Sequence, residues 1–155
     1  MRFRIAVQWT PSTMYHFREG LQAVRNVDRS RLSCSSPRML RGSVDLDDAL
    51  EAARPHDSRW DYAIGIRRHG SQHESVVWLE VHPASSRHID EVLRKLQWLR
   101  NWLETDAPYL RAMPGEFRWV ATGTVAFRRG SREEKRIAER GLRFPAKHLH
   151  LDDAG

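Results

Sequence analysis

The stretch Val76–Pro83, with the sequence VVWLEVHP, decides the fold of this 155-residue chain. Seven of its eight residues suit the interior or the edge of a β-sheet. The remaining one, Glu80, is a carboxylate in the middle of an apolar run. A strand this hydrophobic carries a charge either because that side chain points to water or because the fold makes use of it.

A second apolar strand is predicted over residues 60–66, and the polar segment between the two strands is predicted to be a hairpin tip. Side chains alternate across a strand, so the faces that carry large apolar residues must match to build a core. A turn at the centre of the polar segment achieves this match and pairs Tyr62 with Leu79. The same register places Asp61 opposite Glu80 on the reverse face of the sheet.

Two opposed carboxylates on one sheet face repel each other. A fold retains such a pair if a cation bridges it, if the two groups share a proton, or if water screens it. Mg²⁺ or Mn²⁺ is the expected cation, because Mg²⁺ is typically held by one or two carboxylates, here Asp61 and Glu80, with water and substrate phosphate as further ligands. His82, on the same face as Glu80, is placed to orient a water molecule, to act as a base, or to add a nitrogen ligand.

The rest of the chain alternates between helical and extended patterns. Helices are predicted over residues 12–26, 45–53, 87–104 and 132–141, and extended segments over 117–127 and 142–151, while residues 28–43 form a polar, irregular stretch with a short strand at 37–40. Strands mixed with helices on this spacing indicate a single domain, residues 1–155, of the α/β (α+β) class, with a central mixed sheet flanked by helices.

The order of features in the middle of the chain resembles the PD-(D/E)XK nuclease superfamily. An Asp begins one strand, a turn follows, the next strand carries a Glu-x-basic pattern, and a long helix comes after it. The resemblance covers residues from about 12 to 125. It implies a restriction-endonuclease-like three-layer core of order α-β-β-β-α-β, with Asp61 and Glu80 as metal ligands. The lysine that follows the motif glutamate by two residues positions or activates the attacking water, and His82 holds that place here. Trp60 also stands where the motif has a proline.

The resemblance suggests two further site residues. A lysine from the following helix can replace the motif lysine, and Lys95 is the candidate; the alternative is a surface ion pair between Lys95 and Glu91, four residues earlier on the same helix. The superfamily often adds an acidic metal ligand from its first helix, which indicates Glu19, with Glu51 or Asp45 as alternatives. Glu19 also suits a solvated helix face.

The positive charge is concentrated in the first third of the chain. Residues 1–44 carry eight arginines against two acidic residues, which equals the whole net charge of +6. Such a segment attracts phosphate backbones. We therefore expect nucleic acid as a partner, bound by Arg18, Arg25, Arg29 and Arg31. The alternative is that the 26 basic residues reflect composition rather than a binding surface.

Cys34 is the only cysteine, which excludes an internal disulfide and indicates a reducing compartment. The chain has no signal-peptide pattern and no run of roughly 18 apolar residues. We therefore expect a cytoplasmic protein without a membrane partner. Trp98 and Trp102 widen the apolar stripe of the predicted helix 87–104, either as core residues or as the contact surface of a homodimer.

These observations predict a metal-dependent, nuclease-like enzyme that acts on nucleic-acid phosphodiesters. The alternative is a catalytically inactive module on the same fold that binds nucleic acid or another protein. The replacement of the motif lysine by His82 favours the inactive module, because histidine lacks the fixed charge of lysine.

Overall fold

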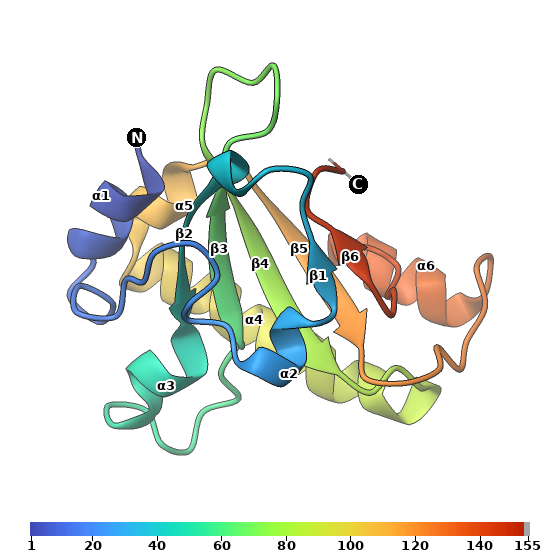
Figure 1. Ribbon diagram of the computed structural model, residues 1–155. Coiled ribbons are helices and arrows are strands. Elements are labelled where there is room, and N and C mark those ends of the chain that lie inside the picture. Colours follow the sequence, from blue (N-terminus) through green and yellow to red (C-terminus); the bar gives the residue numbers. More distant parts are fainter. Residues whose placement is uncertain (154–155) are drawn as a thin grey trace.

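A four-stranded mixed β-sheet forms the centre of the molecule in the computed structural model, which describes residues 1–153 (Figure 1). Its strands lie in the order β2 (Leu40–Asp45), β3 (Tyr62–Ile66), β4 (Ser75–His82) and β5 (Gly115–Ala121). Neighbouring strands are antiparallel from β2 to β4, whereas β4 and β5 are parallel. A parallel pair needs a crossover connection, and the long helix α4 (Ile89–Thr105) supplies it.

Shorter elements surround this sheet. They are α1 (Phe3–Gln8), α2 (Asn26–Arg29), the 3₁₀ helix η1 (Pro37–Met39), α3 (Leu46–Glu51), the 3₁₀ helix η2 (Ser86–His88), α5 (Pro108–Ala112) and α6 (Arg132–Glu139). Two short parallel strands, β1 (Leu32–Ser33) and β6 (Leu149–His150), form a second sheet. Figure 1 shows α4 behind the main sheet and the β1–β6 pair in front of it, so the sheet is covered on both faces. None of the helices within residues 1–153 has the length and apolarity that a membrane span requires.

The hairpin of β3 and β4 has the predicted register. Tyr62 pairs with Leu79, and Ile64 pairs with Val77. These side chains are buried together with Leu32 and neighbouring apolar residues on the face covered by β1 and β6. Matching the large apolar faces therefore identified the correct pairing of the two strands.

The opposite face of the sheet packs against the helices. The predicted apolar stripe of α4 is buried there with Val76 and Trp78 of β4. Trp60 belongs to this cluster as well, with its ring 6.5 Å from that of Phe117, although alternation predicted it on the face of Tyr62. The difference arises because β3 begins at Tyr62, and alternation does not extend to residues before the strand.

Three of the four predicted helices are present. They correspond to α3, α4 and α6, and a side-chain hydrogen bond caps the first turn of each of the two short ones. The Asp45 carboxylate accepts a hydrogen bond from the Asp48 amide at 2.9 Å at the start of α3. The Ser131 hydroxyl likewise accepts from the Glu134 amide at 3.2 Å, and α6 ends before Gly141, whose φ is +81°.

The prediction of a helix over residues 12–26 is wrong. The structure has a series of turns there, and the helix of this region is α1, earlier in the chain. The buried Thr13 hydroxyl donates to the Val7 carbonyl at 2.9 Å, so it bonds the C-terminal turn of α1 and folds the chain back. Gly20, with φ of +51°, interrupts any helical continuation.

Strand β2 lies partly inside the stretch predicted to be irregular, and the strand predicted at 37–40 is mostly the 3₁₀ helix η1. The pairing of β2 with β3 shifts register between Leu40 and Gly42, and Gly42 has φ of +117°. This irregularity breaks the alternation by which a strand is recognised in a sequence.

Candidate active site

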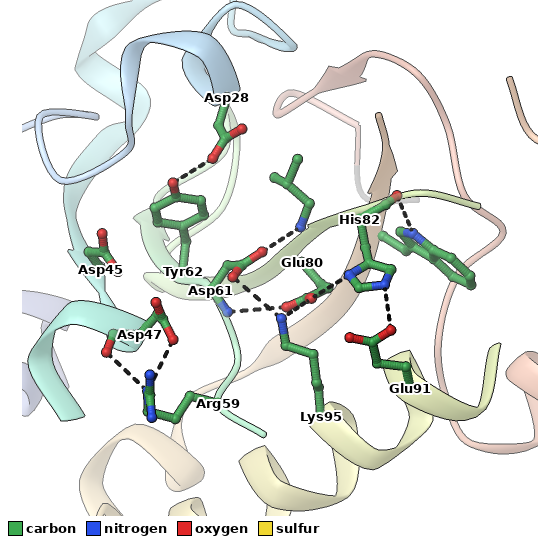
Figure 2. Close-up of polar contacts among 12 residues, drawn as sticks. Asp28, Asp45, Asp47, Arg59, Asp61, Tyr62, Glu80, His82, Glu91 and Lys95 are labelled. Atoms are coloured by element: carbon green, nitrogen blue, oxygen red, sulfur yellow. Dashed lines mark hydrogen bonds and ion pairs between the residues drawn. The ribbon is translucent and has the colours of Figure 1, made fainter. Parts of the chain in front are cut away.

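Three ionisable side chains from three elements meet at one end of the main sheet (Figure 2). Asp61 directly precedes β3, Glu80 lies near the end of β4, and Lys95 projects from the middle of α4. The Lys95 Nζ atom lies 3.5 Å from Asp61 Oδ1 and contacts Glu80 Oε2 directly. The predicted convergence of Asp61 and Glu80 is therefore present, and a lysine bridges them.

Backbone amides hold both carboxylates in place. The Asp61 amide donates to Glu80 Oε1 at 3.2 Å, and the Val81 amide donates to Asp61 Oδ2 at 2.9 Å. The antiparallel register of β3 and β4 makes these reciprocal bonds possible, because it sets Asp61 opposite Glu80 where the hairpin opens. Each carboxylate is thus fixed to the neighbouring strand as well as to Lys95.

Glu80 has 0% of its surface exposed, so the charge in the VVWLEVHP strand does not point to water. A buried carboxylate without a partner costs several kcal/mol, and Lys95 together with the Asp61 amide offsets that cost. Of the three ways in which a fold retains opposed carboxylates, this structure contains a bridging cation, namely the lysine ammonium.

The surface interpretation of Lys95 is wrong. Its side chain is 15% exposed and pairs with Glu80 and Asp61, whereas Glu91 contacts His82 instead. The lysine lies beside the apolar stripe of α4 that faces the sheet, and its flexible stem carries the ammonium to Glu80. A pair that is shielded from water is electrostatically stronger than an exposed i, i+4 pair.

The three groups shift one another's protonation. Burial, and then the nearby charge of Glu80, raise the pKa of Asp61 to about 7, although Lys95 acts in the opposite direction. Burial disfavours the charge of Lys95, yet Glu80 and Asp61 outweigh it, so the pKa of Lys95 is raised above its ordinary value. Lys95 therefore stays charged, and Asp61 exchanges a proton near neutral pH.

His82 lies between two carboxylates (Figure 2). Its Nδ1 is 3.6 Å from Glu80 Oε2, and its Nε2 is 3.2 Å from Glu91 Oε2. The contact with the Glu80 carboxylate raises the pKa of His82 against the effect of burial. An imidazolium donates from both nitrogens, so this environment favours His82 as a proton donor or as a positioning group over the role of base.

Glu19 is not a third member of the site. It forms an ion pair with Arg4 at 3.2 Å, and its side chain is 70% exposed. The helix that was expected to carry it inward is absent, which removes the reason for placing it there. Of the alternatives, Glu51 is exposed and Asp45 caps α3. No three His, Cys, Asp or Glu side chains within residues 1–153 are grouped so that they can hold a metal ion.

Two contacts beside the site could not be anticipated from local sequence patterns. Arg59 donates to the Asp47 carboxylate at 3.0 Å, and Asp47 in turn contributes to the raised pKa of Asp61. The Tyr62 hydroxyl donates to the Asp28 carboxylate at 2.6 Å and so ties α2 to the start of β3. Both contacts join segments that are brought together only by the tertiary fold.

The four arginines predicted to bind nucleic acid are distributed over different surroundings. Arg25 is exposed, 4.0 Å from Asp45, while Arg29 donates to the Val24 carbonyl. Arg18 is exposed and donates to the carbonyls of Tyr15 and Phe17, and Arg31 is half-buried before β1. Arg25 and Arg29 flank Asp28, so they lie near Tyr62 and the site. Their role in binding stays a prediction.

The two tryptophans of α4 differ in their surroundings. Their rings stack 6.2 Å apart, and Trp102 is buried in the core, whereas Trp98 is half-buried and donates to the Asp57 carboxylate at 2.9 Å. Trp102 thus acts in the core, and a homodimer through this helix stays a prediction.

The site is therefore a buried glutamate and a partly buried aspartate that a helix lysine bridges, with a histidine beside them that contacts Glu80 and Glu91. Comparison of the chain with family models, curated proteins and solved structures gave no match.

Proposed function

We propose that this protein is a metal-dependent nuclease of the PD-(D/E)XK type that hydrolyses nucleic-acid phosphodiesters. The observation that carries the proposal is that Lys95 of α4 contacts both Glu80 of β4 and Asp61, which directly precedes β3. In this assignment Lys95 performs the role of the motif lysine, and His82 occupies the sequence position of that lysine. The presence of histidine at position 82 is then a weaker argument for an inactive module.

The strand order supports a restriction-endonuclease-like core. Three antiparallel strands, β2 to β4, are followed by the crossover helix α4 and the parallel strand β5, and α1 precedes them. This gives the order α-β-β-β-α-β that the resemblance implies, with α3 and the β1–β6 pair as additions. The candidate residues lie where β3 begins and β4 ends.

The donor set fits Mg²⁺ or Mn²⁺. Asp61 and Glu80 supply two carboxylate groups, which is what Mg²⁺ usually takes from a protein. The raised pKa of Asp61 reflects burial and repulsion by Glu80, and a divalent cation relieves that repulsion. When bound, the metal lowers the pKa of a water molecule and stabilises charge on the phosphate. Lys95 offers positive charge to the substrate, and His82 offers a proton to it.

The test is cleavage of duplex DNA, single-stranded DNA and RNA by the purified chain, with Mg²⁺ or Mn²⁺ and with EDTA. We expect metal-dependent product, which Glu80→Gln and Lys95→Met each reduce by about 10²-fold or more. Asp106→Asn is the control, because Asp106 pairs with Arg54 beyond the end of α4 and outside the site.

The proposal fails if the wild type gives no metal-stimulated product on any substrate, or if Glu80→Gln cleaves as well as the wild type. Circular dichroism and thermal unfolding of every variant separate loss of activity from loss of the fold. Lys95→Arg, which keeps the charge, provides a second variant if Lys95→Met does not fold.

A catalytically inactive binding module is the second candidate. The observation that favours it is that Lys95 already bridges both carboxylates, with Glu80 fully buried. In that case nucleic acid binds equally well with EDTA and with Glu80→Gln, and no metal-stimulated product appears.

A further inference from the structure

A second basic region lies near the C-terminus, outside the arginine-rich first third. Residues 128–147 contain eight Arg and Lys residues against three Glu, a net charge of +5. Arg128, Arg129 and Arg132 are exposed, and so is Arg87 of η2. We call these four residues the C-terminal basic surface. What matters is where the fold places them relative to Glu80.

The topology sets this surface at the same edge of the sheet as the candidate site. Because β4 and β5 are parallel, both end at one edge, where His82 pairs with Ala121. The segments that follow these strands, 83–88 and 122–131, therefore leave the sheet side by side (Figure 1). Arg87 lies on the first segment, and Arg128 and Arg129 lie on the second.

Hydrogen bonds join the two segments to each other and to the site. The Thr122 amide donates to the His82 carbonyl at 3.3 Å, and the Ala126 amide donates to the Ala84 carbonyl at 2.8 Å. The Trp119 indole also donates to the His82 carbonyl, at 3.0 Å. Since the ring of the same His82 contacts Glu80, the basic segment is fixed directly beside the site.

An ion pair also joins helix α6 to the start of α4, beside the site. The Arg136 guanidinium pairs with Asp90 in the first turn of α4, next to Glu91, which contacts His82. Arg132 lies one helical turn before Arg136 and so shares its face of α6. The exposed Arg132 therefore lies toward the N-terminal end of α4 and the site.

The guanidinium groups are available to a ligand. Arg129 is 76% exposed; it lies over the Phe144 ring at 4.5 Å and 3.7 Å from Glu134. An exposed ion pair of this kind contributes little and exchanges readily with a phosphate. Arginine presents a planar set of donors that matches phosphate oxygens in a bidentate manner.

We propose that the C-terminal basic surface binds the phosphodiester backbone of a nucleic acid and presents it to the Asp61–Glu80–Lys95 site. The choice of nucleic acid rests on the proposed function, whereas the location of the surface rests on the topology and hydrogen bonds given above. Arg25 directly precedes α2 and donates its amide to the Tyr62 hydroxyl at 3.4 Å, and Arg29 ends α2, so both flank the same end of the sheet.

The experiment measures binding rather than cleavage. Fluorescence anisotropy of labelled duplex and single-stranded DNA is followed in EDTA from about 50 to 200 mM salt. We expect the triple variant Arg128→Ala, Arg129→Ala, Arg132→Ala to bind at least about tenfold more weakly at the lower salt concentration. Its plot of log affinity against log salt should be less steep by about 2 to 3 for duplex DNA.

The control is a triple variant with the same loss of charge at the opposite end of the sheet, namely Arg2→Ala, Arg38→Ala and Arg67→Ala. These residues are exposed near the hairpin tip, where the Arg67 amide donates to the Met39 carbonyl. We expect the control to lose less than about twofold in affinity.

Equal losses in the two triple variants would mean that binding follows net charge alone, and this would overturn the proposal. So would unchanged affinity of the first triple variant, or preferential binding to anionic vesicles over DNA. Because EDTA prevents metal-dependent cleavage, this experiment measures binding independently of activity. Salt-sensitive binding here, together with no product in the separate cleavage assay with Mg²⁺ or Mn²⁺, would refute the proposed enzyme and leave the surface intact.

Discussion

At the scale of single residues, Asp61 carries the most informative property of the site. Its pKa is raised to about 7 by burial and by Glu80, well above the value of about 3.9 expected in the unfolded chain. The folded protein therefore binds more protons than the unfolded chain between these two pH values. By linkage, this group makes the free energy of unfolding fall as pH rises from about 4 to about 7.

Asp61→Asn removes this contribution. We expect the free energy of unfolding of the wild type, measured with urea between pH 5 and pH 7, to decrease more steeply with pH than that of the variant. The difference is at most about 1.4 kcal/mol per pH unit, which corresponds to one proton. Parallel curves for the two proteins would show that Asp61 does not titrate in this range.

Lys95 and Glu80 are energetically coupled at the scale of single residues. Removing either partner leaves the buried charge of the other without its partner. We expect Lys95→Met or Glu80→Gln alone to destabilise the fold by about 3–5 kcal/mol. The double variant should lose clearly less than the sum of the single losses, since neither Lys95 nor Glu80 is left without its partner and the Val81 amide still holds Asp61. Additive losses in urea unfolding would indicate that the pair does not interact.

At the scale of elements, Gly65 of β3 allows α1 to pack closely against the sheet. A Cβ atom at this position would lie 2.3 Å from the ring of Phe3, so the glycine makes room for the helix. We expect Gly65→Ala to destabilise the protein by about 1–3 kcal/mol through overpacking. In a Phe3→Ala background, which removes Cγ and the ring, Gly65→Ala should cost less; an unchanged cost would contradict this account.

The elements recognised from the sequence are those with uninterrupted periodicity. The apolar stripe of α4 and the matched faces of the β3–β4 hairpin gave correct boundaries to within a few residues and the correct register. Helix α1 and strand β2 were missed, because α1 has only six residues and the pairing of β2 shifts at Gly42. Local patterns fail where tertiary contacts, such as Phe3 on Gly65, decide the conformation.

The same distinction holds for the candidate site. Asp61 and Glu80 were found because strand register is encoded locally. The contact of Lys95 with them was only one of two interpretations, since helix spacing also allowed an ion pair with Glu91. The sequence could not decide between the two, because packing against the sheet sets the rotation of α4 and so the direction in which Lys95 points. Glu19 was misplaced because its helix does not exist.

At the scale of the whole molecule, a metal that binds only the folded state must stabilise it. If Asp61 and Glu80 hold Mn²⁺, the stabilisation at about ten times the dissociation constant is about 1.4 kcal/mol, or about 3–6 °C in Tm. The rise in Tm should be larger at pH 8 than at pH 6. At pH 6 a proton occupies Asp61 and competes with the metal, because the pKa of Asp61 is about 7.

Thermal unfolding with increasing Mn²⁺ at both pH values tests this linkage without any substrate. We expect Glu80→Gln to abolish the rise in Tm and Asp106→Asn to retain it. Lys95→Met should strengthen metal binding, because its ammonium occupies the position between the two carboxylates that a cation would share. A rise in Tm that is equal in the wild type and in Glu80→Gln would place the metal elsewhere. The buried carboxylate pair would then serve only to anchor α4 to the sheet through Lys95.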